Sequence, residues 1–378
     1  MKFPVGFKWG SATSAHQIEG NNYNDWSEWE KARPEEFRSG KACDSYNRYE
    51  EDFDIAKKLN QNIHRFSIEW SRIEPKEGRF DHEAMHHYVN VVKALRERGI
   101  EPMVTLWHFT NPVWFAEKGG FLKDRVGLWI TFNEATTTVA SNSYLKGIWP
   151  PEKRNIFDAL KFRRNIIKAH TLAYQEIKNI YNVPQSLQGP ALGTSHNVEV
   201  GISEFNFHFV AGKMFGWTSK MLNNLTNNYA WNNTMSYCDF LALQYYTIFR
   251  LPGSFSGLPK QLVMEEMGWE IYPKGIYHRL MELKKLKKPI FVTENGIADG
   301  KDKLREKFIK EHLRWVWQAI RDGADVRGYM YWSLLDNFEW ARGYGPRFGL
   351  VEVDFKTFER KIRPSALEYA KICRENKL

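Results

Sequence analysis

Strand-like and helix-like segments alternate along all 378 residues of this chain, and this alternation restricts its fold more than any other feature. Short runs rich in β-branched and aromatic residues recur eight times, with apolar stripes at helical spacing between them. Such alternation predicts a parallel sheet covered by helices, and eight strands can close into a barrel filled by side chains. The predicted strands are residues 7–15, 63–70, 101–109, 128–134, 199–205, 239–246, 289–296 and 326–336.

The segments between these strands have the periodicity and the end signals of helices. One apolar stripe runs at three- and four-residue spacing from Ala159 through Phe162 and Ile166 to Ile177, and Gly99 and Gly323 stand where two helices should end. No linker, repeat or low-complexity tract divides the chain. With 43% hydrophobic residues, the chain can bury a large core, so we predict a single-domain α/β fold, a (β/α)8 TIM barrel over residues 1–378.

Two places fit this barrel less well. Only nineteen residues separate His108 from Leu128, and residues 112–119 are the one convincing helix among them, so we predict a shortened crossover between strands 3 and 4. Residues 182–197 are rich in Pro, Gly, Ser and Gln, which is typical of a surface loop.

Charge and cysteine content exclude several classes of function. The net charge is +9. The densest cluster of basic residues lies at the end of a predicted helix, where cations interact favourably with the negative end of the helix dipole; it consists of Lys284, Lys285, Lys287 and Lys288. We therefore expect no nucleic-acid partner. Three cysteines without CxxC spacing indicate neither a disulfide framework nor a zinc site, and no signal peptide or membrane span is visible. We expect a cytoplasmic protein without a membrane partner; a homo-oligomer stays open.

Two glutamates follow hydrophobic strands and carry the candidate chemistry. Glu134 ends the motif TFNE at 131–134, and Glu294 lies within VTENG at 292–296. In a barrel both reach the C-terminal mouth, where active sites lie. Retaining glycosidases need one carboxylate as nucleophile and a second carboxyl group, initially protonated, as acid/base. Arg65, at the end of the second strand, is the cation available to keep one of them ionised.

With these two glutamate motifs, the chain resembles family 1 of the glycoside hydrolases, the β-glucosidase and β-galactosidase family. The resemblance extends over nearly the whole chain, and its further motifs are 7–14 (FKWGSATS), 17–20 (QIEG) and 347–354 (RFGLVEVD). It implies that Glu294 is the nucleophile and Glu134 the acid/base, supported by Arg65, Asn133 and Tyr246. It also implies hydrolysis of a small β-glycoside or oligosaccharide with no metal and no organic cofactor.

The resemblance also implies a set of sugar-binding residues. Bidentate polar side chains can read hydroxyl orientation, since a mismatched sugar leaves buried polar groups unpaired. Glu339 should repel a phosphate at the sugar's 6-position, which favours unphosphorylated β-glucosides, β-galactosides or β-fucosides. The implied sugar-binding residues are Gln17, His108, Asn133, Glu339 and Trp340, with Trp332 as an aromatic floor and with Trp269 and Phe109 as walls of the leaving-group site.

Several positions depart from the pattern of that family. Ala135 replaces the usual proline after the acid/base, Thr136 stands where many members have an aromatic wall, and Gln244 occupies a position that is often asparagine. A helix between strands 3 and 4 is also missing. We therefore expect an exposed apolar groove beside that crossover, or a partner that covers it.

Two alternatives remain open from the sequence. His82 and His86 with Glu83 match the HExxH zinc pattern of metalloproteases, although they lie on a predicted outer helix away from any cleft. The second alternative is a catalytically weak or inactive sugar-binding barrel, lectin-like or a scaffold, because a side chain displaced by about 1 Å can cost on the order of 100-fold in rate.

Overall fold

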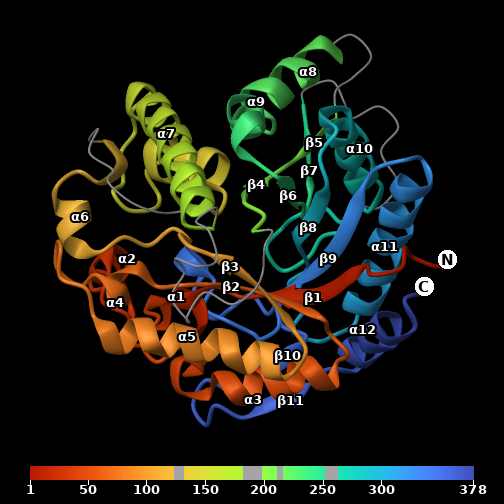
Figure 1. Ribbon diagram of the computed structural model, residues 1–378, viewed down its shortest axis with the longest axis horizontal. Coiled ribbons are helices and arrows are strands. Elements are labelled where there is room, and N and C mark those ends of the chain that lie inside the picture. Colours follow the sequence, from red (N-terminus) through yellow and green to blue (C-terminus); the bar gives the residue numbers. More distant parts are fainter. Residues whose placement is uncertain (123–131, 182–197, 211–215, 252–262) are drawn as a thin grey trace.

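Seven parallel strands form one curved sheet at the centre of the molecule (Figure 1). The computed structural model describes residues 1–122, 132–181, 198–210, 216–251 and 263–378. The strands lie in the order β3-β2-β1-β9-β8-β6-β4. Their bounds are β1 (Lys8–Ala12), β2 (Ile63–Ser67), β3 (Glu101–Thr105), β4 (Gly201–Phe205), β6 (Phe240–Gln244), β8 (Ile290–Asn295) and β9 (Val326–Trp332).

The eighth strand position lies between the two edge strands of this sheet. Phe132 forms a parallel bridge with Trp107, just after β3, and Asn133 forms a parallel bridge with Ser203 on β4. The described end of the predicted strand 128–134 therefore links β3 to β4, while residues 128–131 lie outside the described part. The predicted (β/α)8 barrel is confirmed; its description as one domain stays a prediction.

Helices cover the outside of the sheet (Figure 1). The predicted stripe on α7 is confirmed, because Ala159, Phe162 and Ile166 are buried, and Gly99 and Gly323 take positive φ just after α5 and α11. The helices are α1 (Ala15–Ile18), α2 (Asp25–Glu30), α3 (Ser45–Lys58), α4 (Trp70–Ile73), α5 (His82–Glu97), α6 (Val113–Glu117), α7 (Ile156–Tyr181), α8 (Gly216–Leu225), α9 (Tyr229–Thr234), α10 (Lys274–Leu283), α11 (Arg305–Arg321) and α12 (Pro364–Glu375).

Shorter elements complete the architecture. The further helices within the described residues are η1 (Glu35–Phe37), η2 (Gly120–Leu122), η3 (Ala135–Leu145), η6 (Met235–Tyr237), η7 (Lys284–Leu286) and η8 (Trp340–Arg342). Two small sheets pair β5 (His208–Val210) with β7 (Ile248–Arg250) and β10 (Val351–Val353) with β11 (Arg360–Ile362). The two termini lie side by side, where Lys2 bridges Lys377 (Figure 1). None of the described helices combines the length and the apolar character that a membrane span requires.

Several ladders end earlier than the sequence patterns predict. The predicted strands 7–15 and 326–336 stop pairing at Ala12 and Trp332, and α1 begins at Ala15. The apolar pattern continues beyond each ladder because the chain that turns over the barrel mouth is also buried. These early ends place the residues after each strand at the C-terminal mouth, where they can line a site.

The crossover between β3 and the eighth strand position is short, as predicted. Among its described residues, only α6 and η2 are helical. Beside them lies a cavity of about 180 Å³ between η2, η3 and α7, with walls that include Trp107, Phe109, Phe121, Tyr144 and Phe162. The exposed apolar groove expected beside the short crossover stays a prediction, because residues 123–131 of the crossover lie outside the described part. The predicted loop at 182–197 lies outside the described residues.

Candidate functional site

The barrel brings the two motif glutamates to the same mouth. Glu294 lies on β8, one residue before its end, and Glu134 follows the two residues that bridge β3 to β4. Both side chains are buried, with 7% of Glu134 and 4% of Glu294 exposed. Their charges also interact, because the charge of Glu294 raises the pKa of Glu134. The structure therefore joins two carboxyl groups that are far apart in the sequence.

Three donors converge on the carboxylate of Glu294. Arg65, on β2, forms an ion pair with Oε1 through Nη1, and Gln244 donates to the same oxygen at 2.5 Å. The hydroxyl of Tyr246 donates to Oε2 at 2.6 Å. Charge-assisted hydrogen bonds of this kind stabilise the ionised form of a carboxyl group.

Asn133 connects this cluster to the other side of the mouth. Its Oδ1 accepts hydrogen bonds from Arg65 at 2.6 Å, Gln244 at 2.7 Å and Ser203 at 3.1 Å. Its Nδ2 lies 3.1 Å from Nε2 of His108. The acceptor Oδ1 is therefore fully occupied, and one Nδ2 hydrogen faces His108. The second Nδ2 hydrogen remains for a ligand hydroxyl.

The environments of the two glutamates push their pKa values apart. Burial and then the charge of Glu294 raise the pKa of Glu134 well above its ordinary value, and the charge of Arg65 acts against this rise. Burial also raises the pKa of Glu294, but the charge of Arg65 and the hydrogen bond from Tyr246 lower it. Glu134 is therefore the carboxyl group that keeps its proton longer as pH rises.

Aromatic rings stack around His108. The ring of Trp332 lies 6.1 Å from that of His108 at an interplanar angle of 22°, and the ring of Trp340 lies 6.0 Å away at 12°. Burial lowers the pKa of His108 well below its usual range, so the imidazole is neutral. Since Nε2 faces the amide of Asn133, Nδ1, which has no partner among the described residues, is left to donate.

Gln17 and Glu339 form a second polar pair at the mouth. Gln17, on α1, donates from Nε2 to Oε2 of Glu339 at 3.3 Å and to the carbonyl of Phe338 at 2.9 Å, while Ser14 donates to its Oε1 at 2.7 Å. Burial, followed by the charge of Glu294, raises the pKa of Glu339 to about 8. The carboxyl group is thus largely neutral at pH 7, which weakens the repulsion of a phosphate that the sequence suggested.

The two predicted leaving-group walls take different places. Trp269 is partly exposed and packs on Tyr246, with ring centroids 5.4 Å apart. Phe109 is buried, has a φ of +76°, and packs on Trp340 at 4.9 Å. Thr136, at the position of an expected wall, is also buried and hydrogen-bonds Glu204 instead, so it does not offer a surface to a ligand.

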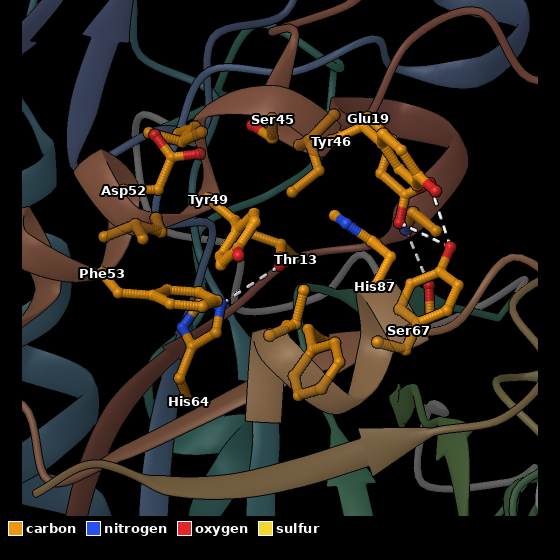
Figure 2. A pocket seen from close by; sticks show the side chains of 17 residues that line it. Thr13, Glu19, Ser45, Tyr46, Tyr49, Asp52, Phe53, His64, Ser67 and His87 are labelled. Carbon is orange, nitrogen blue, oxygen red and sulfur yellow. Dashed lines mark hydrogen bonds between the residues drawn. The ribbon is translucent and has the colours of Figure 1, made fainter. Parts of the chain in front are cut away.

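A second, smaller cavity lies behind β2, between the barrel wall and α3 and α5 (Figure 2). His64 faces it, bonded to Thr13 at 3.2 Å, whereas the next residue, Arg65, faces the barrel interior. Burial lowers the pKa of His64 to about 3, so the ring is neutral. At about 40 Å³ the cavity has room for water molecules but not for a sugar ring.

Other sequence candidates do not form sites. His82, Glu83 and His86 are all exposed along α5, and no cluster of three metal-ligating side chains occurs within the described residues. Two of the four clustered lysines cap backbone carbonyls: Lys284 donates to Asp322 at 2.6 Å and Lys288 to Cys238 at 2.6 Å. The three cysteines are buried free thiols.

Sequence reasoning missed two polar residues next to the glutamates. Gln244 departs from the family pattern and is not among the predicted site residues, yet it donates a hydrogen bond to Glu294. A signal was available, because Gln244 and Tyr246 are two residues apart in an extended segment and so share a face. Glu204, on β4, is also absent from the predicted site, although its buried carboxylate accepts a hydrogen bond from Thr136 in the segment that leaves Glu134.

Comparison with known proteins places this geometry among sugar hydrolases. The sequence model of a family described as "Glycosyl hydrolase family 1" matches residues 1–205 and 239–378. The chain is 32% identical to β-glucosidase A of Thermotoga maritima over 443 aligned positions that cover 100% of this chain and 99% of that protein. Because the chain has 378 residues, this relative carries segments that the chain lacks.

One solved structure and one further relative extend the comparison. The β-glycosidase from Pyrococcus horikoshii superposes with a TM-score of 0.87 at 37% identity, covering 100% of this chain and 96% of that one. The 6-phospho-β-glucosidase GmuD of Bacillus subtilis is 29% identical over 98% of this chain and 97% of its own length. The relatives thus include proteins named for both plain and phosphorylated glucosides.

Proposed function

Because the chain belongs to glycosyl hydrolase family 1, and is thus an O-glycosyl hydrolase, we propose that it is a retaining exo-β-glycosidase with Glu294 as nucleophile and Glu134 as acid/base. The observation that carries this assignment is the asymmetry of the two carboxyl groups. Arg65, Gln244 and Tyr246 all donate to Glu294. Glu134 has no such set of donors among its described contacts, and burial raises its pKa well above the ordinary value.

The reaction proceeds in two displacements. Glu294 attacks the anomeric carbon and forms a glycosyl ester, while the proton of Glu134 passes to the departing oxygen. Arg65 and Tyr246 restrain Glu294 during the attack, and Asn133 offers its remaining Nδ2 hydrogen to the 2-hydroxyl. Glu134, now ionised, then takes a proton from water, which attacks the anomeric carbon and releases the sugar with its β configuration.

The substrates that we propose are unphosphorylated β-glucosides, β-galactosides or β-fucosides. His108, Gln17 and Glu339 supply donors and acceptors for hydroxyl groups, and Trp332 and Trp340 supply aromatic faces. Since the pKa of Glu339 is about 8, charge repulsion by this carboxyl group contributes little to discrimination against a 6-phosphate at neutral pH. Assaying nitrophenyl β-glucoside against its 6-phosphate tests this point directly.

We also propose that the protein works in the reducing cytoplasm, because its three cysteines are free and buried. No metal or organic cofactor takes part in the proposed reaction.

Hydrolysis of nitrophenyl β-glycosides tests the assignment. We expect turnover by the wild type, its loss in Glu294→Ala, and loss in Glu134→Ala that is smallest for the best leaving groups, with Glu83→Ala on the outer helix as a matched control. Binding of a glucoside without turnover by the wild type would instead support a lectin-like barrel. Full activity in Glu294→Ala would contradict the proposed nucleophile.

A further inference from the structure

A third buried carboxyl group lies behind the acid/base. Glu204 lies on β4 next to Ser203, and its side chain is fully buried. Because neighbouring strand residues face opposite ways, Ser203 points into the barrel toward Arg65, and Glu204 points outward toward η3 and α7. Nothing in the proposed reaction uses this residue.

Glu204 holds the first residues of η3. Its Oε1 accepts hydrogen bonds from the backbone N–H of Thr136 at 3.1 Å and from the hydroxyl of Thr136 at 2.8 Å. Its Oε2 accepts from the hydroxyl of Thr137 at 2.8 Å. All three donors come from the two residues that stand two and three positions after Glu134. A carboxylate that accepts three hydrogen bonds from one turn fixes that turn firmly.

The backbone at Glu134 needs such support. Its φ is +45°, in the left-handed region that costs a residue with a side chain about 1 to 2 kcal/mol. Upstream, its N–H donates to the carbonyl of Ser203 at 2.8 Å, which ties it to β4. Downstream, Ala135 restricts the chain no more than an ordinary residue does, and the next side chains tied to β4 are those of Thr136 and Thr137.

We propose that Glu204 is a positioning residue for Glu134: by clamping Thr136 and Thr137 to β4, it fixes the left-handed turn that aims the acid/base carboxyl group at the leaving oxygen. The inference rests on the proposed function, because it assigns Glu204 a role only if Glu134 donates a proton. Glu204 itself does not touch the substrate.

The surrounding charges provide a second readout. Glu134 is faced by Glu294 from β8, Arg65 from β2, Glu204 from β4 and Thr138 from η3, and the charge of Glu204 adds to the raised pKa of Glu134. Burial raises the pKa of Glu204 itself. Hydrogen bonds from Thr137 and Thr136, and the charge of Arg163 on α7, oppose this rise. Removing the charge of Glu204 should therefore let Glu134 lose its proton at lower pH.

A matched pair of variants separates clamp from charge. Glu204→Gln keeps an oxygen for Thr136 and an amide beside Thr137, whereas Glu204→Leu keeps the approximate size but removes every acceptor. The readout is kcat/KM, which reports the first displacement, for aryl β-glucosides with good and poor leaving groups. A dinitrophenolate departs without being protonated. A poor leaving group departs only if a correctly oriented acid, here Glu134, donates a proton to its oxygen.

For Glu204→Leu we expect kcat/KM to fall about 10- to 100-fold on the poor leaving group, as a displacement near 1 Å would cause, and less than about threefold on the dinitrophenyl glucoside. For Glu204→Gln we expect less than about threefold loss on both, with the alkaline limb of the pH profile at lower pH. Equal losses of Glu204→Leu on both substrates, or no loss on either, would overturn the inference.

Two controls distinguish a failure of this inference from a failure of the proposed function and from misfolding of the variant. Glu134→Ala must show the same leaving-group selectivity in stronger form; if it does not, the proposed acid/base is wrong, whatever Glu204 does. If Glu204→Leu does not fold, the double variant Thr136→Val with Thr137→Val removes both hydroxyl donors and leaves the buried carboxyl in place. A wild-type leaving-group profile in that folded variant would refute the clamp.

Discussion

Replacing Arg65 by methionine is the sharpest perturbation of the proposed nucleophile. Arg65 is 3% exposed and bridges Glu294, Asn133 and Thr105, so no water can replace its guanidinium without rearrangement. Methionine keeps much of the length of the side chain and removes the charge and all of these donors. Gln244 and Tyr246 would be left to hold the carboxylate of Glu294.

The expected loss follows from the contacts that disappear. A hydrogen bond to a charged group contributes about 1.5 to 3 kcal/mol, which corresponds to about a 10- to 150-fold decrease in kcat/KM if the contact is needed in the transition state. The direction of the pH effect is also fixed. Arg65 lowers the pKa of Glu294, so without it that pKa rises, and the acid limb of the kcat/KM profile moves to higher pH.

Stability offers an independent check on the same pair. Leaving one buried charge without its partner costs about 3 to 5 kcal/mol, so Arg65→Met should lower the free energy of unfolding in urea. Adding Glu294→Gln removes the orphaned charge, and we expect the double variant to recover part of that loss while remaining inactive. An acid limb that stays at its wild-type pH in an Arg65→Met variant would refute the role of Arg65 in keeping Glu294 ionised.

The remaining predictions concern other parts of the molecule. Burial raises the pKa of Glu19 from 4.5 to about 7, so the folded state holds a proton that the unfolded chain releases between these values. The free energy of unfolding should therefore fall from about pH 4.5 to about pH 7 in the wild type, and this component, on the order of 3 kcal/mol at most, should be absent in Glu19→Gln, as measured by urea unfolding at several pH values. Val139→Phe fills part of the cavity of about 180 Å³ and should raise the free energy of unfolding by about 1 kcal/mol; a loss of that size would mean that the cavity cannot accept a ring. EDTA should leave the rate unchanged, as should His86→Ala on exposed α5, and a rate that depends on zinc would revive the metalloenzyme alternative.

The barrel could be predicted from the sequence because its signals are local and repeated. The pattern at 289–296 gives β8 within one residue at each end, and placing Glu294 at its end needs only the alternation of strands and helices. Gly99 and Gly323 could be placed for the same reason, since a helix end with positive φ favours glycine. Each of these features depends on a few neighbouring residues.

Features that depend on residues far apart in the sequence could not be predicted in this way. The register of β6 against β8 shifts between Leu243 and Gln244, and no periodicity shows which side chain then meets Glu294. Glu204 in a strand looks like a solvent-facing residue until η3 is seen packed against it. The raised pKa of Glu339 likewise arises from burial and from Glu294, which is distant in the sequence.

The central claim is that Glu294 becomes covalently bound to the sugar, and a slow substrate tests it most directly. A 2-deoxy-2-fluoro-β-glucosyl fluoride should inactivate the enzyme with time, because the fluorine slows both displacements and the fluoride leaving group keeps the first one fast enough. Peptide mass mapping should then find one fluoroglucosyl group, attached to Glu294. A label on Glu134 or Glu204, or steady turnover of this reagent without any labelled peptide, would contradict the account.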